Sequence, residues 1–354
     1  MTEQANTNTF YRHKSRGGIG IATLIIAVFW LITLVGAHVV GISVQTLLSD
    51  TIKRAGMNGV LVLAMVPAIQ SGTGPNFALP IGIVCGLLAA VCAIEFDLMG
   101  VSWLLASVLL SIPLAVIAGY LYGKLLNAVK GSEMTIATYA GFSITALMCL
   151  VWMMVPFSNP KMGWFIGTGL RETIQLGAVG SAQILNNFLA FKIGEVIIPT
   201  GMLLVFGFFA VLVWLFFRSK TGIAISAGGE NPKFAQAAGL SIDRNRILAN
   251  IFSTVLGAIG IIIYSQSFGY AQIYTAPLLM AFPAVAAILI GGATAARANV
   301  LNVVIGVFLF QGLLTAALPV ANEVFAGTDL SEIMRAIIQN GVILYALTQI
   351  KKGG

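Results

Sequence analysis

Charged residues are scarce in this 354-residue chain, where Asp, Glu, Lys and Arg together make up 9% of the sequence. A soluble globular domain is about 25% charged, because its surface has to be solvated by water. With 58% hydrophobic residues, the chain cannot cover a water-facing surface of its own. The scarcity of charge excludes an ordinary soluble protein and predicts a chain that is solvated mostly by lipid.

Residues that support catalysis or metal binding are also few. His13 and His38 stand alone, and Cys85, Cys92 and Cys149 all fall inside apolar runs, where free cysteine behaves as a small hydrophobe. The sequence contains no Gly-X-X-X-X-Gly-Lys-Ser/Thr phosphate loop, so we expect no nucleotide hydrolysis by this chain. The pattern predicts no catalytic residue, no metal site and no cofactor held by the chain itself.

Long uncharged runs dominate what is present. A spanning helix needs about 20 apolar residues, and the runs predict an all-α integral membrane protein. The first run is longer than the apolar core of a signal peptide, so we interpret it as a retained helix. We expect a single transmembrane domain over residues 19–350, after a cytoplasmic N-terminal tail over residues 1–18. About ten transmembrane helices are predicted, over residues 19–40, 55–70, 78–95, 101–123, 134–156, 196–217, 247–266, 279–293, 298–318 and 336–350.

The distribution of Lys and Arg predicts the orientation. With a cytoplasmic N-terminus, 13 of the 19 basic residues lie on the inner side and 6 on the outer side, as the positive-inside rule favours. Both termini and the loop 218–246 are then cytoplasmic, and the segments 157–195 and 319–335 are periplasmic. Lys53 and Arg54 fit the positive-inside rule least well, because this orientation puts them on the outer side of the membrane. The net charge of +7 suits contact with anionic lipid headgroups and requires no nucleic acid.

Two polar interruptions, at residues 71–76 and 291–297, each follow an apolar span that carries a proline, Pro67 or Pro283. The similarity is a weak internal repeat, and transporters often combine such repeats with interrupted helices beside the substrate. A plain tight turn is the alternative. The uncharged polar residues near the first interruption predict a path for a neutral solute, unless they only bond helices together. These residues are Gln70, Thr73, Asn76 and Thr138.

A polar segment, residues 226–246, separates two apolar spans. Asn231 is a favoured helix N-cap, Pro232 suits the first helical position, and Gly239 suits the end of a helix. The spacing predicts a short helix of two turns that follows a turn at Gly228-Gly229. Since two turns are marginal in water, the apolar side of this helix, with Phe234, requires a partner.

The amino-acid sequence of this segment resembles the signature loop of permease subunits in ABC importers of the ribose/galactose type. That family belongs to the same superfamily as the branched-chain amino acid permeases. The matching positions are Gly229, Asn231, Pro232, Ala235, Gly239 and Leu240. The resemblance implies a coupling helix that docks on a separate cytoplasmic ABC ATPase, on which ATP and Mg²⁺ act. The implied coupling residues are Glu230, Asn231, Pro232, Lys233, Phe234, Ala235, Ala238 and Gly239.

Looser similarity covers most of the chain from about residue 55, including residues 70–82, 134–143 and 284–306. It implies a substrate-binding protein and a second permease copy or paralogue as further partners. Two departures from the family pattern matter. No Asp stands in residues 72–77, and Tyr139-Ala140-Gly141 replaces the usual Leu-Gly, so the substrate cannot be carried over from ribose or galactose.

The sequence thus predicts the permease subunit of an ABC importer in the bacterial inner membrane. Its cargo is expected to be a small neutral solute, such as a sugar, a nucleoside or a sugar derivative. A branched-chain amino acid permease is one alternative, and an ATP-independent secondary transporter or facilitator is another. The lack of carboxylates within the predicted spans argues against proton coupling. A structural membrane protein would need no interrupted spans.

Overall fold

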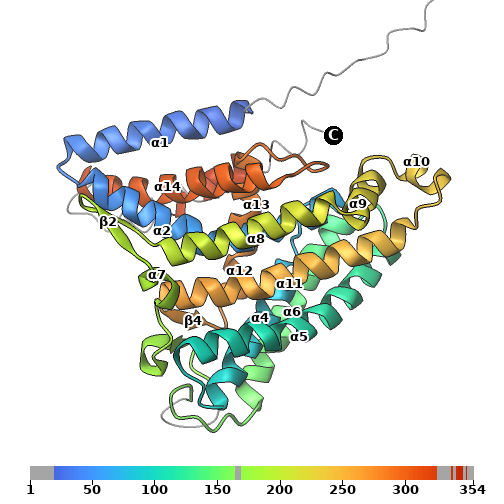
Figure 1. Ribbon diagram of the computed structural model, residues 1–354, viewed down its shortest axis with the longest axis horizontal. Coiled ribbons are helices and arrows are strands. Elements are labelled where there is room, and N and C mark those ends of the chain that lie inside the picture. Colours follow the sequence, from blue (N-terminus) through green and yellow to red (C-terminus); the bar gives the residue numbers. More distant parts are fainter. Residues whose placement is uncertain (1–19, 164–168, 325–335, 338–339, 346–347, 349–354) are drawn as a thin grey trace, which may run out of the picture.

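Long helices form a bundle with α10 at one end and β2 at the other (Figure 1). The computed structural model describes residues 20–163, 169–324, 336–337, 340–345 and 348. The first helices are α1 (Ile21–Val39), α2 (Val44–Leu63), α3 (Met65–Gln70), α4 (Leu79–Glu95), α5 (Gly100–Ala128) and α6 (Glu133–Met154). Then come α7 (Ile184–Asn187), α8 (Thr200–Arg218), α9 (Lys220–Glu230), α10 (Pro232–Ala237), α11 (Ile242–Phe268), α12 (Ala276–Leu279), α13 (Ala281–Ile290) and α14 (Val300–Val324).

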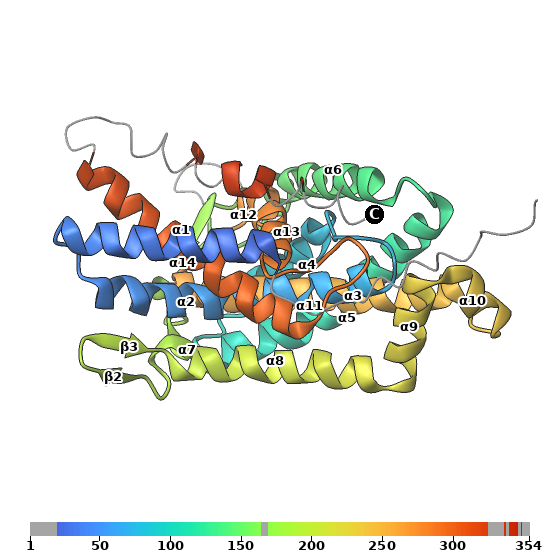
Figure 2. The same cartoon turned by 90° about the horizontal axis from the view of Figure 1, so that it is seen from above.

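Among the residues that the structure describes, four short strands and one 3-10 helix lie outside these helices. They are β1 (Thr173–Gln175), β2 (Phe191–Ile193), β3 (Val196–Ile198), β4 (Tyr270–Gln272) and the 3-10 turn Leu176–Val179. Strand β1 pairs antiparallel with β4, and β2 pairs antiparallel with β3. The β2–β3 hairpin lies at the end of the bundle opposite α10 (Figures 1 and 2).

The all-α membrane prediction is confirmed. Within the described residues, seven helices are long and apolar enough to cross a membrane, and two shorter apolar helices cover 79–95 and 276–290. These nine correspond to the first nine predicted spans. Of the tenth, 336–350, residues 336–337, 340–345 and 348 are described and are helical, whereas the predicted tail over 1–18 falls wholly outside the described residues.

The second span differs from its prediction. Its helix begins at Val44, not at residue 55, because the Ser43 hydroxyl caps it by accepting a hydrogen bond from the Thr46 amide. Lys53 and Arg54 therefore lie within the helix and not in an outer loop. The 27 residues from Val44 to Gln70 extend roughly 40 Å along the helix axis at about 1.5 Å per residue. Since the hydrocarbon core is about 30 Å thick, the charged end of α2 can project beyond it.

Residues 71–76 and 291–297 are both non-helical, as predicted, and a further break, not predicted, lies within the span before each of them. Helix α2 gives way to α3 at Ala64, three residues before Pro67, and α12 gives way to α13 at Met280, three residues before Pro283. Proline has no N–H to donate to the carbonyl four residues earlier. The carbonyl of Ala64, at the first of these breaks, accepts a hydrogen bond from the Ser253 hydroxyl of α11 at 2.6 Å.

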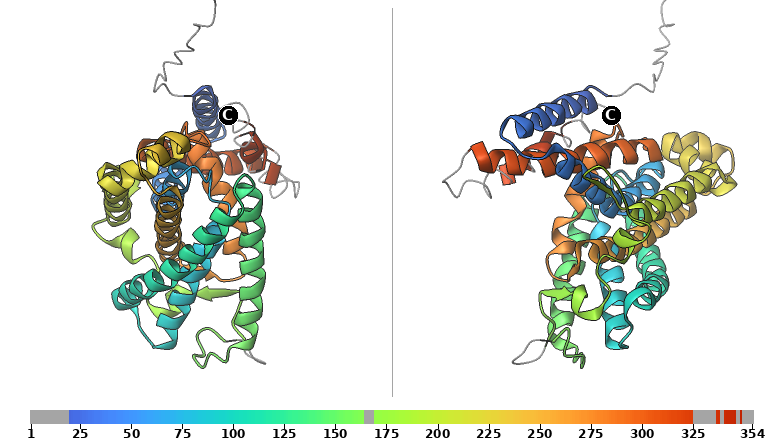
Figure 3. Two further views of the ribbon diagram at one scale, coloured as in Figure 1. Left: turned by 90° about the vertical axis from the view of Figure 1, so that its right-hand side faces the viewer. Right: turned by 60° about the vertical axis from the view of Figure 1, so that its left-hand side comes forward.

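Helix α11 is central, and close glycine contacts hold its neighbours against it. In α2 and α11, 78% and 72% of the apolar window is buried, against 17–22% in α1, α5, α6 and α8. A Cβ added at Gly82 or Gly86 of α4 would meet α11 backbone at 2.5 and 2.3 Å, and one at Gly119 of α5 would meet it at 2.8 Å. Small residues permit such close approach between membrane helices. Helix α6 instead stands at the edge of the bundle (Figures 2 and 3).

Replacement of Gly86 by Ala should destabilise the fold, because the new methyl group would lie 2.3 Å from the Ala258 carbonyl oxygen. Overpacking of this kind costs about 1–3 kcal/mol. The control is Gly207→Ala in α8, where a Cβ meets nothing within 4 Å. Thermal unfolding in detergent measures the difference; equal midpoints for the two variants would contradict the packing described here.

Candidate functional site

The polar segment forms two short helices in place of a single one. The predicted turn at Gly228-Gly229 is wrong, because α9 continues through both glycines to Glu230. The predicted caps of the next helix are confirmed. The Asn231 side-chain oxygen accepts the Phe234 amide at 3.1 Å, Pro232 occupies the first helical position, and Gly239 adopts φ +81° just beyond the helix. Helix α10 is therefore short and closed at both ends.

The two sides of α10 differ in burial. Ala235 is buried against the protein, whereas Phe234, Lys233, Ala237 and Ala238 point outward. The Phe234 side chain is 68% exposed. An exposed phenylalanine on a six-residue helix has no packing role within the described protomer. The apolar side predicted to need a partner is thus present and uncovered.

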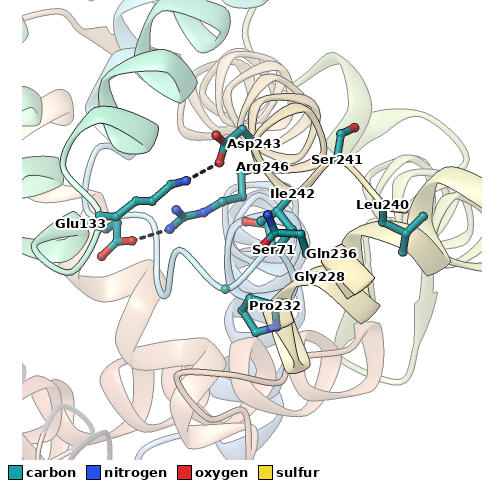
Figure 4. A pocket seen from close by; sticks show the side chains of 13 residues that line it. Ser71, Glu133, Gly228, Pro232, Gln236, Leu240, Ser241, Ile242, Asp243 and Arg246 are labelled. Atoms are coloured by element: carbon teal, nitrogen blue, oxygen red, sulfur yellow. Dashed lines mark hydrogen bonds and ion pairs between the residues drawn. The ribbon is translucent and has the colours of Figure 1, made fainter. Parts of the chain in front are cut away.

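A cavity of about 540 Å³ lies between α10, the first interruption and the start of α11 (Figure 4). Two ion pairs border it and join the α5–α6 connection to α11. Lys130 pairs with Asp243 at 2.6 Å, both largely exposed, and Glu133 pairs with Arg246, both nearly buried. The remaining lining residues are Ser71, Gly72, Gly228, Gly229, Pro232, Gln236, Leu240, Ser241 and Ile242. Sequence analysis missed the Glu133–Arg246 pair, because its members lie 113 positions apart.

The first interruption satisfies its own polar groups. The Thr73 amide and hydroxyl both donate to the Ala68 carbonyl, and the Thr73 side chain is buried. Asn76 is 2% exposed; it donates to the Ser253 hydroxyl at 2.8 Å and accepts from Tyr122 at 3.2 Å. Side chains of the same chain thus bond several polar groups of this interruption. A role for Thr73 and Asn76 in a substrate path stays a prediction.

The other two predicted path residues lie nearby. Gln70 donates from its amide nitrogen to the Ala298 carbonyl at 2.5 Å, which joins the first interruption to the end of the second. Thr138 lies on α6 and donates to the Met134 carbonyl one turn earlier. The Met134 side chain packs on Gly74. The structure thus brings all four residues to one region, at the α10 end of the bundle.

Gly141 lies in the segment that departs from the family pattern, and it contacts the end of the first interruption. A Cβ at this position would lie 3.1 Å from the Phe77 carbonyl oxygen, so α6 approaches the first interruption backbone to backbone. The second interruption is packed in the same way. A Cβ at Gly291 would lie 1.8 Å from the Asn302 carbonyl oxygen, and one at Gly306 would lie 1.9 Å from that of Ala287. These glycines were visible in the sequence, but their contacts were not.

The two ion pairs should differ in their contribution to stability. Glu133→Gln leaves the guanidinium of Arg246, which is 8% exposed, without its charge partner, and breaking a buried pair costs about 3–5 kcal/mol. Asp243→Asn removes a pair whose members are 53% and 59% exposed, and such pairs contribute about 0–1 kcal/mol. Thermal unfolding of both variants in detergent gives the comparison. A larger loss for Asp243→Asn would refute it.

A family model described as "Branched-chain amino acid transport system / permease component" matches residues 47–347. The nucleoside ABC transporter permease protein NupB of Lactococcus lactis subsp. cremoris (strain MG1363) is 25% identical over 224 residues. This match covers 61% of the present chain and 58% of NupB, so the chain spans little more than half of that relative. The galactofuranose transporter permease protein YtfT of Escherichia coli (strain K12) is 27% identical over 306 residues, covering 84% and 78% of the two chains.

Among solved structures, a metal-chelate type ABC transporter in an inward-facing conformation aligns with a TM-score of 0.43 and 14% identity. The alignment covers 92% of this chain and 98% of that chain. A similarity this low carries no argument about mechanism. The family match, in contrast, extends over most of the chain, from α2 to the last described helix. The chain therefore belongs to the family of permease components described for branched-chain amino acid transport systems, which are transport subunits and not enzymes.

Proposed function

We propose that this permease docks α10 on a separate cytoplasmic ABC ATPase and imports a small neutral solute delivered by a binding protein. The observation that carries the proposal is the capped α10 helix, which presents an exposed Phe234 beside a cavity of about 540 Å³. A secondary transporter needs no such docking helix. Because the sequence has no phosphate loop, ATP is hydrolysed by the partner ATPase, which binds ATP and Mg²⁺.

Basic residues support a cytoplasmic location for the α10 end. Lys and Arg concentrate in cytoplasmic loops, and the connections at the α10 end are richer in them than those at the β2–β3 end. The described basic residues at the α10 end are Lys124, Lys130, Arg218, Lys220, Lys233, Arg244, Arg246 and Arg297. Those toward the opposite end are Lys53 and Arg54 in α2 and Lys161, Arg171 and Lys192 in the connections. This orientation corresponds to a bacterial inner-membrane protein with cytoplasmic termini.

The chemistry of the cargo is best supported as neutral and hydroxylated. Both curated relatives are named for such solutes, galactofuranose and nucleosides. The four predicted path residues are uncharged, and uncharged donors and acceptors suit hydroxyl groups. The description of the family model favours a branched-chain amino acid as the alternative. A zwitterionic amino acid presents two charges that the path residues would leave without a counter-charge.

The outward face of α6 supports a second permease copy as a partner. Thr135, Tyr139 and Ser143 are exposed on the first half of this helix, among apolar residues such as Phe142 and Leu147. Polar side chains at membrane depth are costly against lipid and generally face protein or a water-filled cavity. We therefore place α6 against the second copy, beside a passage that both copies share.

Replacement of both Pro232 and Phe234 by Asp should abolish ATPase docking and solute uptake while the protein stays in the membrane. The change removes the first-turn proline and puts charge on the exposed apolar side of α10. Phe234→Tyr is the control, because it keeps the aromatic ring. Co-purification of the ATPase from detergent extracts and uptake into proteoliposomes measure the two effects. Docking that survives the double substitution rules the proposal out.

Cysteine at position 192, in the β2–β3 hairpin, should cross-link to the substrate-binding protein from outside the cell. Lys192 lies in β2, whose three residues are all exposed at the end opposite α10. Cysteine at position 233 in α10 is the control and should cross-link only to the ATPase. The three native cysteines are replaced first. Cross-links to the binding protein from position 233 alone would reverse the proposed orientation.

A further inference from the structure

The end of α9 rests directly on the first membrane interruption. A Cβ added at Gly229 would lie 2.2 Å from the Gln70 carbonyl oxygen and 2.8 Å from the Gly72 amide nitrogen. Gly72 adopts φ +77°, and a Cβ there would lie 3.0 Å from the Gly229 Cα. The two glycines thus bring the coupling segment and the interruption together backbone to backbone, with no side chain between them.

The second membrane interruption joins the same contact. Glu230, the residue after Gly229, pairs with Arg297 at 3.0 Å. Gln70 donates to the Ala298 carbonyl at 2.5 Å. Three segments distant in sequence, residues 229–230, 70–72 and 297–298, therefore meet at one point, which we call the junction. It borders the cavity beneath α10, which Ser71, Gly72, Gly228 and Gly229 help to line (Figure 4).

The junction is suited to transmit displacement. Backbone contacts contain no rotatable side chain that could absorb a shift, and close-packed protein interiors have low compressibility and transmit strain. Gly72 follows the end of α3, and residues 73–76 lead into α4. The buried Asn76 fixes this segment by donating a hydrogen bond to Ser253 of α11. Ala298 lies two residues before α14. A displacement of α10 would therefore act on the ends of α3, α4 and α14 together.

We propose that Gly229 is a positioning residue that couples docking at α10 to both membrane interruptions, with the Glu230–Arg297 pair as a second link. This inference rests on the proposed docking function and adds the route by which docking changes the membrane domain. The adjacent Gly228 supplies a comparison, because a Cβ there meets nothing within 4 Å.

The experiment compares Gly229→Ala with Gly228→Ala in the full transporter, reconstituted with its ATPase and binding protein. Both substitutions put the same residue at neighbouring positions of α9, so helix propensity is matched. Gly229→Ala should retain ATPase affinity but lower the solute imported per ATP hydrolysed by about tenfold, within the usual range of coupling between sites. Gly228→Ala should stay within about twofold of the natural protein, as for a substitution without contacts.

The ion pair gives a second variant that tests the same junction. Arg297 and Glu230 are 60% and 47% exposed, so their separation should not unfold the protein. Arg297→Glu should lower the solute imported per ATP, and adding Glu230→Arg should restore it with the charges exchanged. A packing role alone predicts no such rescue. If Gly229→Ala does not fold, the Arg297 and Glu230 variants test the inference in its place. An unchanged amount of solute imported per ATP in Arg297→Glu would overturn it.

Failure of the inference can be told apart from failure of the docking proposal. If Gly229→Ala binds the ATPase and imports with normal coupling, the junction is not the route, although docking at α10 stands. Equal losses in Gly228→Ala and Gly229→Ala likewise overturn the role of the contact. If the Pro232 and Phe234 double variant retains ATPase binding, the docking proposal itself is wrong.

Discussion

Close approach of backbones around α11 is the constraint on which the rest of this structure depends. In lipid, apolar side chains gain little by leaving their surroundings for another apolar helix, so association relies on packing and on hydrogen bonds. Glycines of α4 and α5 let these helices lie directly on α11. Ser253 and Asn76 then provide polar contacts between α11 and its neighbours. Helices α1 and α8, in which only 17% of the apolar window is buried, occupy the periphery.

The same constraint shapes the functional end of the molecule. An interrupted helix exposes backbone groups that lipid cannot satisfy, and here they bond to side chains of the same chain, such as Thr73 and Asn76. The glycines at 229 and 291 allow other backbone segments to close over the interruptions. The coupling segment is therefore part of the same packed unit as the membrane helices. A loosely attached loop would leave the interruptions without this cover.

Prediction from sequence succeeded where the cause is local. Hydropathy located the spans, Pro67 and Pro283 marked both interrupted helices, and the Asn231-Pro232 pair marked the start of α10. It failed where a local signal competed with packing. Gly228-Gly229 suggested a turn, yet α9 continues through it, because Gly229 is needed for contact with Gln70 and not for chain reversal. The early start of α2 was missed because Lys53 and Arg54 resembled a loop.

By itself, the sequence determined that the chain is helical, that it spans a membrane and that its α10 segment is a capped helix. Each of these follows from residues close together in the chain, through hydropathy, proline geometry and side-chain caps. Only the tertiary structure decided which segments meet. The Glu133–Arg246 pair, the Gln70–Ala298 bond and the Gly72–Gly229 contact join residues more than 100 positions apart. Such contacts depend on how the helices pack in three dimensions, and no local pattern of residues specifies that arrangement.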